Sequence, residues 1–260
     1  MNLINSSQNP KIKKIKRYLD KISQQKKDNI FLVSGEREIK KAKKNNFAID
    51  SVFITKETKK KLISDLEIDN EKINIIEKNL LTKISPSKNP SQILGICQRK
   101  KNNFSIENKN QKEIILVLDN LEKPGNIGAI LRTALGFGVK NIIINGDNTD
   151  IYHHNIIRAS LGSIFFMNIS CLSYKETYQT LKENNIDIYA TFLDKKSKSI
   201  TELKKSKKNI ALILGSEDKG INKLWQEKSN ELIFLPMKKE IDSLNVSVSA
   251  GILLWIFFSK

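Results

Sequence analysis

The chain has 260 residues, of which 39% are hydrophobic and 28% charged, and its formal net charge is +17. This content supports a real core, and the length suffices for two domains of ordinary size. No apolar run reaches the roughly 20 residues that span a bilayer, and the first residues form no apolar signal segment, which argues against a membrane or secreted protein. We therefore expect a cytoplasmic protein.

Positive charge is concentrated in the first part of the chain. Residues 1–110 hold 25 Lys and Arg against 12 Asp and Glu, whereas residues 111–260 hold 20 against 16. A lysine-rich coding bias does not explain this asymmetry. No basic stretch has the strong apolar face of a helix that lies on a membrane, so we expect a nucleic acid as the polyanionic partner.

Residues 1–98 predict a small α/β domain. Ile12, Ile15, Leu19 and Ile22 recur at helical spacing in a run that is otherwise basic. Strands and helices then alternate, with strands at 29–35, 51–55, 73–77 and 93–98 and helices at 36–45, 57–67 and 79–85. Residues 99–112 are polar and charged, which is typical of a linker.

Residues 113–260 predict a second α/β domain with a mainly parallel sheet. The run 113–121 is continuously apolar, as in a strand that is buried on both faces. Further strands are predicted at 141–145, 164–170, 186–193, 209–217 and 231–237, and helices at 127–138, 153–162, 174–185 and 221–229. Strand–helix alternation of this density indicates an α/β fold.

A buried C-terminal helix is predicted in the last apolar run, which ends near Phe258. Ser243 precedes the run, and its hydroxyl can accept a hydrogen bond from the first helical turn, so we expect it to cap the helix. Small residues (Ser247, Ser249, Ala250 and Gly251) alternate with large ones. This pattern allows close approach to a neighbouring backbone or to a partner subunit.

Cysteine and histidine give no signal of a metal site or of catalysis. Cys97 and Cys171 are far apart and lack metal-ligand spacing, so we expect neither a disulfide nor a zinc site but two buried thiols. His153 and His154 fall where a helix is predicted to start. A loop or helix-start role is favoured for them over catalysis.

Three stretches lie where a parallel sheet places its ligands, at the carboxyl ends of predicted strands. In the first, Gly125 and Gly128 allow a tight turn and leave N–H groups open at a helix start. The second is LILGSEDKGI, and the third begins at Leu235. None is a Rossmann GxGxxG or Walker GxxxxGK[ST] motif, which argues against nicotinamide enzymes and P-loop NTPases.

In order and spacing, these stretches resemble the three motifs of the SpoU (TrmH-type) ribose methyltransferases of the SPOUT superfamily. The matching segments are PGNIGAILRTA (124–134), LILGSEDKG (212–220) and residues 235–254. The first half is similar to the substrate-binding domain of rRNA-directed members, through SSQNPKIKKIKRY and FLVSGEREIKKA. The resemblance covers nearly the whole chain. The linker composition at 99–112 places the two domains at 1–98 and 113–260.

The resemblance implies a fold, a cofactor and a partner subunit. The fold is a mainly parallel sheet with helices on both faces and a deep trefoil knot, preceded by a smaller α/β RNA-binding domain. The protein would be a homodimer that holds S-adenosylmethionine in the knot and needs no metal, with the C-terminal helix in the knot and the dimer seam. Contacts to the cofactor would come from Thr191, Leu193, Gly215, Gly220, Leu235, Met237 and Leu244.

The resemblance also implies the reaction, which is attack of a ribose 2′-hydroxyl on the sulfonium methyl group. Asn126, Arg132, Glu217, Ser243 and Asn245 occupy the functional positions of the family. Arg132 would hold a phosphate, since a guanidinium matches phosphate with two parallel hydrogen bonds; action as the base stays open, although free arginine keeps its proton tightly. Glu217 would support Asn126, and Ser243 and Asn245 would orient the ribose or the cofactor.

Basic residues outside the motifs are expected to contact RNA. Those in the first half are Lys11, Lys13, Lys14, Arg17 and Arg37. Arg158 either contacts RNA or pairs with a helix end. Three residues depart from the family pattern: Lys123 stands where many relatives have Asp, Asp218 stands where Gly is common, and Lys239 replaces a frequent Gly.

We therefore expect an S-adenosylmethionine-dependent RNA 2′-O-ribose methyltransferase that acts on 23S rRNA. The globular first domain favours rRNA, as does the end of the chain at Lys260 without a basic extension. One alternative is a tRNA methyltransferase of the same family. The other is a non-catalytic RNA-binding or ribosome-assembly protein with this fold.

Overall fold

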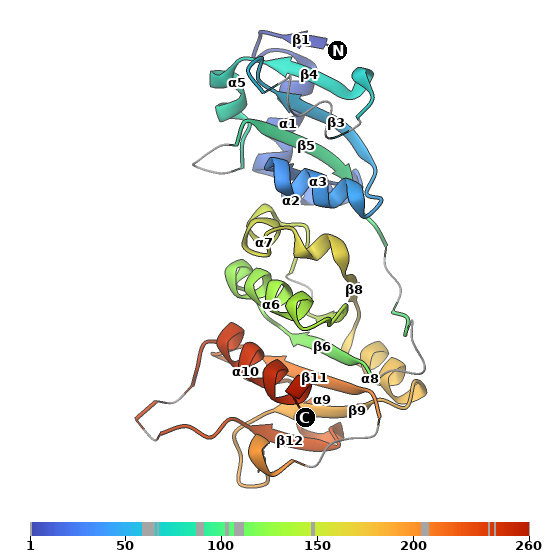
Figure 1. Ribbon diagram of the computed structural model, residues 1–260, viewed down its shortest axis with the longest axis vertical. Helices are drawn as coiled ribbons and strands as arrows, with labels where there is room; N and C mark the ends of the chain where they lie inside the picture. Colours follow the sequence, from blue (N-terminus) through green and yellow to red (C-terminus); the bar gives the residue numbers. More distant parts are fainter. Residues whose placement is uncertain are drawn as a thin grey trace. The chain divides into compact units, whose positions relative to one another are not determined.

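The computed structural model describes residues 2–58, 66, 68–86, 91–101, 104–106, 112–146, 149–203, 208–238, 240–241 and 243–259 (Figure 1). The chain divides into two compact units. The first holds Met1–Lys100 and Ile151–Phe165, and the second holds Lys101–Asp150 and Phe166–Lys260. Most of the helix predicted at 57–67 and part of the linker predicted at 99–112 lie outside the described residues.

A mixed five-stranded sheet forms the centre of the first unit. Its strands, in spatial order, are β1 (Asn2–Ile4), β4 (Ile73–Ile76), β3 (Ile49–Ile54), β5 (Ile93–Gln98) and β2 (Ile30–Ser34). β5 runs antiparallel to both of its neighbours, and the other pairs are parallel. Among the described residues before Lys100, the helices are α1 (Pro10–Asp20), α2 (Ile22–Lys27), α3 (Glu36–Lys44) and α5 (Lys78–Lys83), with a 3₁₀ turn, η1, at Asn70–Lys72.

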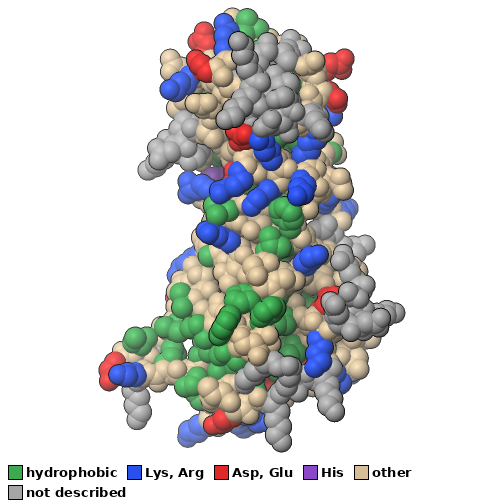
Figure 2. Space-filling view, viewed as in Figure 1, with side chains coloured by type: hydrophobic (Ala, Val, Ile, Leu, Met, Phe, Trp, Pro, Cys, Tyr) green, Lys and Arg blue, Asp and Glu red, His purple; other side chains and the backbone are tan. Residues whose placement is uncertain are grey.

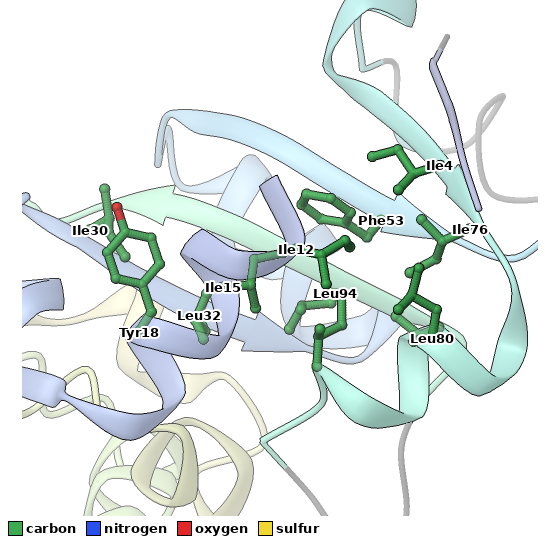
Figure 3. Packing of buried hydrophobic residues seen from close by; sticks show 12 residues of the cluster. Ile4, Ile12, Ile15, Tyr18, Ile30, Leu32, Phe53, Ile76, Leu80 and Leu94 are labelled. Carbon is green, nitrogen blue, oxygen red and sulfur yellow. The ribbon is translucent and has the colours of Figure 1, made fainter. Parts of the chain in front are cut away.

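The basic helix predicted near the N-terminus is present, but it breaks into α1 and α2 at Lys21, which is extended. Asn9 caps α1 by accepting a hydrogen bond from the Lys11 N–H at 2.9 Å, and Pro10 stands at the first helical position. Ile12 and Ile15 are fully buried. They pack with Phe53, Leu94 and their neighbours between α1 and the sheet (Figure 3).

A segment from the second half of the chain completes the first unit. Tyr152 stacks on Phe31 with ring centroids 4.4 Å apart, and Phe165 meets Phe47 edge-on at 5.1 Å. We call these four buried rings the aromatic cluster. The segment also carries α7 (His154–Ala159), and the Lys41 ammonium donates to the Leu161 carbonyl at 2.8 Å. The domain limits predicted from the sequence place this segment in the second domain, and they stay a prediction.

The strand predicted at 164–170 is wrong in its first part. Residues Ser163–Phe166 form a 3₁₀ turn, η2, and β8 begins only at Asn168. Phe165 is buried in the aromatic cluster of the first unit, whereas β8 belongs to the sheet of the second. The chain therefore leaves one unit and enters the other within a single apolar run.

The second unit contains a parallel sheet of seven strands, which confirms the mainly parallel sheet that the sequence predicts. In spatial order they are β10 (Lys198–Ser199), β12 (Glu231–Phe234), β9 (Asp187–Thr191), β11 (Ile210–Gly215), β6 (Ile114–Asp119), β7 (Asn141–Asn145) and β8 (Asn168–Cys171). Every pair is parallel. β6 and β11 lie side by side near the middle of the sheet, which explains why both are continuously apolar.

Helices cover both faces of this sheet, as expected. α8 (Tyr174–Glu183) and α9 (Lys223–Lys228) bury Leu181 and Trp225 against Ile115, Val117 and Ile213. α6 (Pro124–Gly136) and α10 (Val246–Ser259) pack together on the opposite face (Figure 1). A 3₁₀ turn, η3, follows β10 at Ile200–Glu202. The trefoil knot stays a prediction.

None of the helices that the structure describes is long and apolar enough to cross a membrane. α10 is the most apolar helix described, and it has only 14 residues.

Candidate active site

The carboxyl ends of β9, β11 and β12 meet the turn before α10 around one cavity of about 300 Å³. Parallel strands end at the same edge of a sheet, so the segments that follow them converge there. All seven residues predicted to contact the cofactor line this cavity: Thr191, Leu193, Gly215, Gly220, Leu235, Met237 and Leu244. Ser243 lines it as well. Most of the other walls are apolar side chains, among them Leu214, Ile233 and Leu253.

The wall contributed by β11 is a tight turn built on two glycines. Ser216 and Gly220 exchange backbone hydrogen bonds of 3.1 and 2.9 Å. A Cβ atom on Gly215 would lie 2.4 Å from the Gly220 carbonyl, and Gly220 itself has φ +64°. The cavity therefore keeps this wall only while both positions are glycine.

A polar network joins the three motif stretches at the edge of the cavity. Glu217 Oε1 accepts hydrogen bonds from Asn126 Nδ2 at 2.9 Å and from Asn245 Nδ2 at 3.0 Å. Asn245 Nδ2 also donates to Asn126 Oδ1 at 3.1 Å. The structure thus brings together three of the five predicted catalytic residues. The first and the last of them, Asn126 and Asn245, are more than 100 residues apart in the sequence.

The Glu217 carboxylate is surrounded by donors. The Val246 N–H lies 3.4 Å from Oε1, and the Lys123 ammonium lies 3.5 Å from Oε2. Partial burial acts to raise the pKa of Glu217, but the Val246 N–H and the Lys123 charge outweigh it and leave the pKa below its ordinary value. The carboxylate is therefore ionised at neutral pH and holds the network as an acceptor.

Asn245 caps α10, and the prediction that Ser243 does so is wrong. Asn245 Oδ1 accepts hydrogen bonds from the Ser247 N–H at 3.0 Å and from the Ser247 hydroxyl at 2.6 Å. The helix begins at Val246, three residues after Ser243, which is too far along the chain for the Ser243 hydroxyl to act as the cap. The cap is thus part of the polar network.

Arg132 stands apart from this network. It lies two turns into α6 and is exposed, and it does not line the cavity just described. Its guanidinium is therefore open to a ligand that approaches from solvent.

A second, smaller cavity of about 70 Å³ lies beside the first. It is formed where the segment after β6 faces the turn after β11. Its lining residues are Asn120, Leu121, Glu122, Lys123, Asn126, Ser216, Glu217, Asp218 and Lys219. Ser216 and Glu217 line both cavities, so the two are contiguous.

Asp119 stabilises the turn that forms one wall of the site, and it was not singled out from the sequence. Its carboxylate is 1% exposed, accepts from the Tyr174 hydroxyl at 2.7 Å and accepts from the Asn222 N–H at 2.5 Å. Burial raises its pKa, against the effect of these two hydrogen bonds. Asn222 caps α9 directly after the Gly220 turn, so Asp119 fixes the end of that turn. The sequence feature that could have pointed to Asp119 is an acidic residue at the end of a continuous apolar strand.

The basic residues predicted to contact RNA in the first half of the chain largely have partners within the first unit. Lys11 donates to the buried Asn74 at 2.7 Å, and Arg17 donates to Gln24 at 2.6 Å. The Lys14 ammonium lies over the Tyr18 ring, and Arg37 donates to Glu38 at 2.9 Å. Lys13 and Arg158 are exposed. Their role toward RNA stays a prediction.

The helix-start role predicted for His153 is confirmed, because its Nδ1 accepts the Asn155 N–H and so caps α7. His154 stacks on His153, and its pKa falls to about 4 through burial and through the charges of His153 and Arg158. Cys97 is a buried thiol, and burial raises its pKa. Cys171 is exposed, so the prediction of two buried thiols is wrong there; it ends β8, a strand at the edge of the sheet.

Comparison with known proteins connects both units to RNA modification. A model of the SpoU rRNA Methylase family matches residues 113–255, and a model of the MRM3-like substrate binding domain matches residues 9–95. The 23S rRNA (guanosine(2553)-2′-O)-methyltransferase RlmP of Bacillus subtilis is 26% identical over 98% of either chain.

Two solved structures share the fold over almost the whole chain. A crystal structure of an RNA 2′-O ribose methyltransferase is 27% identical, with a TM-score of 0.83, and the match covers 99% of this chain and 98% of that one. The AdoMet-bound rRNA methyltransferase from Sinorhizobium meliloti is 23% identical, with a TM-score of 0.86, over 98% and 97%.

Proposed function

Because this chain belongs to the SpoU rRNA methylase family, we propose that it transfers the methyl group of S-adenosylmethionine to a ribose 2′-hydroxyl of 23S rRNA. One observation carries the proposal. Two of the three motif stretches line the larger cavity, and the first joins them at its edge through the network of Asn126, Glu217 and Asn245. A protein that only bound RNA would need neither this cavity nor this network.

The residues of the larger cavity fit S-adenosylmethionine. Its volume of about 300 Å³ lies at the lower end of the range of ligand sites, and its walls are mostly apolar, as a nucleoside ring requires. Gly215 and Gly220 bring backbone N–H and carbonyl groups close to the cavity, where they can form hydrogen bonds with the polar atoms of such a ligand. When bound, the cofactor supplies an electrophilic methyl group on its sulfonium.

We assign the polar network to orientation of the ribose. Glu217 holds the side-chain amides of Asn126 and Asn245, so both amides are fixed before the substrate arrives. Ser243 lines the cavity and can donate to the ribose or to the cofactor. Arg132 is exposed on α6, and there it would hold an RNA phosphate through two parallel hydrogen bonds.

The choice of 23S rRNA over tRNA rests on the relatives and on the first unit. RlmP, named for its action on 23S rRNA, is similar over 98% of both chains. Residues 9–95 match a substrate binding domain, and residues 1–110 carry most of the net positive charge. We propose that the reaction takes place in the cytoplasm, where ribosomal RNA is found.

We also propose a homodimer whose seam includes α10, and a trefoil knot around the larger cavity. α10 exposes Val248, Ile252, Trp255 and Phe258, the first three of which recur at helical spacing. Hydrophobic side chains gather over the face where α10 lies (Figure 2). Contiguous apolar surface of this kind is typical of a subunit interface.

Mapping of ribose methylation tests the proposed function. RNA from a strain that lacks the gene should have lost one 2′-O-methyl mark in 23S rRNA, and a copy of the gene should restore it. Loss of a tRNA mark with intact rRNA would instead identify the tRNA enzyme. Calorimetry with S-adenosylmethionine tests the non-catalytic alternative, since no binding at millimolar ligand would contradict a methyltransferase and favour an RNA-binding protein.

A further inference from the structure

The smaller cavity has a charge pattern that the proposed chemistry does not use. Two ion pairs cross the cavity, and the lysine comes from a different segment in each pair. Lys123, after β6, lies 3.5 Å from Glu217 after β11, whereas Glu122, after β6, lies 3.6 Å from Lys219 after β11. Each of the two segments that form the cavity therefore offers one ammonium and one carboxylate to the other.

Both lysines are held loosely. A tight ammonium–carboxylate pair has a separation of about 2.7–2.9 Å, and both pairs here are longer. The side chains of Lys123 and Lys219 are 64% and 70% exposed. An ion pair with a largely exposed lysine adds little to stability, so little opposes the exchange of its carboxylate for a stronger acceptor.

Glu217 keeps other hydrogen-bond donors when Lys123 leaves. Its Oε1 atom already accepts the two asparagine amides at 2.9 and 3.0 Å and the Val246 N–H. Departure of the lysine would therefore leave no buried carboxylate without a partner. Glu122 is more than half exposed, so water can replace Lys219 beside it.

The size and position of the cavity indicate which ligand would pair with the two lysines. Its volume of about 70 Å³ corresponds to roughly two water molecules, which suits a phosphate group and not a base. It adjoins the larger cavity through Ser216 and Glu217. A ribose whose 2′-hydroxyl reaches the larger cavity would thus carry its own phosphate to the smaller one. The first turn of α6, which starts after Lys123 and has no side-chain cap, adds its partial positive charge there.

We propose that the smaller cavity binds an RNA backbone phosphate next to the methylated ribose, and that Lys123 and Lys219 exchange their glutamate partners for this phosphate. The proposal rests on the proposed function, which supplies the RNA. Asp218 also lines the cavity, and its carboxylate repels the incoming anion.

Binding of a 23S rRNA transcript in the presence of S-adenosylhomocysteine tests the proposal without turnover. Lys123→Ala and Lys219→Ala should each weaken RNA binding about three- to fivefold. Each should also reduce the steepness of the plot of log binding constant against log salt concentration by roughly 0.7–1. Asp218→Asn should tighten binding. Lys223→Ala is the matched control, because Lys223 is an exposed lysine that pairs with Glu227 outside the cavity.

The outcomes separate this proposal from the proposed function. If both cavity variants have the salt slope of Lys223→Ala while the wild type methylates RNA, the phosphate site is wrong and the function stands. If the cavity variants lose slope but the wild type never transfers a methyl group, the contact between the cavity and an RNA phosphate stands and the methyltransferase function fails. Weaker binding by Asp218→Asn would also overturn the phosphate site.

Discussion

Gly215 and Gly220 approach so closely across one turn that a Cβ atom on Gly215 would lie 2.4 Å from the Gly220 carbonyl carbon and oxygen. Both atoms belong to the backbone, which cannot move aside as a flexible side chain can. The turn that they close forms a wall of the larger cavity. Any side chain at residue 215 must therefore open that wall.

Gly215→Ala should lower the affinity for S-adenosylmethionine by at least tenfold and destabilise the fold by roughly 1–3 kcal/mol, because the turn must shift to admit the methyl group. Calorimetry and thermal unfolding measure the two effects. Gly136→Ala is the matched control, since nothing lies within 4 Å of the added atom and alanine suits a helix better than glycine. Cofactor affinity equal in the two variants would remove Gly215 from the site.

Arg132→Ala should nearly abolish methyl transfer while leaving the affinity for S-adenosylmethionine within a few fold, because Arg132 does not line the cofactor cavity. The side chain is exposed, so the melting temperature should be unchanged. Arg132→Lys keeps the charge but loses the planar fork, and we expect it to recover only a small part of the rate. Transfer at the wild-type rate by Arg132→Ala would show that the assignment is wrong.

His154 should make the protein less stable in acid. Its pKa is about 4 in the folded chain and near 6.5 when the chain is unfolded, so between these values the unfolded state binds more protons. Stability therefore falls as pH drops from about 6.5 toward 4, by roughly 1–2 kcal/mol after allowance for solvent screening of a half-buried ring. The melting temperature of His154→Gln, followed from pH 7 to pH 5, should fall less than that of the wild type. Parallel curves would contradict the pKa assignment.

Trp255→Glu should convert the proposed dimer to a monomer. Trp255 is 61% exposed and Phe258 is 63% exposed, and both rings contact Phe137. A carboxylate in the middle of a buried apolar seam would cost several kcal/mol, whereas on an open surface it costs almost nothing. Light scattering during gel filtration measures the mass. Lys223→Glu, a change at a side chain that is 85% exposed, controls for the added negative charge, and a wild-type protein of monomeric mass would contradict the dimer.

The sequence predicted most of the fold of the second unit because its strands are continuous apolar runs separated by amphipathic helices. It missed β1 and β10, which have three and two residues, because so short a strand shows no periodicity. It placed the helix cap on Ser243 because hydroxyl residues are good caps, whereas Asn245 takes the cap through its contacts with Asn126 and Glu217. That outcome depends on residues distant in the sequence.

The site was predicted in its composition but not in its contacts. The three motifs indicated that residues such as Gly215, Leu235 and Leu244 belong together, and they line one cavity. Nothing in the local pattern indicated that Lys123 and Glu122 would pair across a second cavity with Glu217 and Lys219, because those pairs depend on the register between two strands. Asp119 was missed because an isolated carboxylate at a strand end gives no information about its donors.

The aromatic cluster has a consequence for the order in which the protein can fold during synthesis. Phe31 and Phe47 are made early, but the rings that cover them, Tyr152 and Phe165, are more than 100 residues further along the chain. The first unit therefore stays incomplete until translation has passed residue 165 and those residues have left the ribosome. Until then the nascent chain carries two uncovered phenylalanines beside its most basic helices, and a fragment that stops at the linker would keep them exposed permanently.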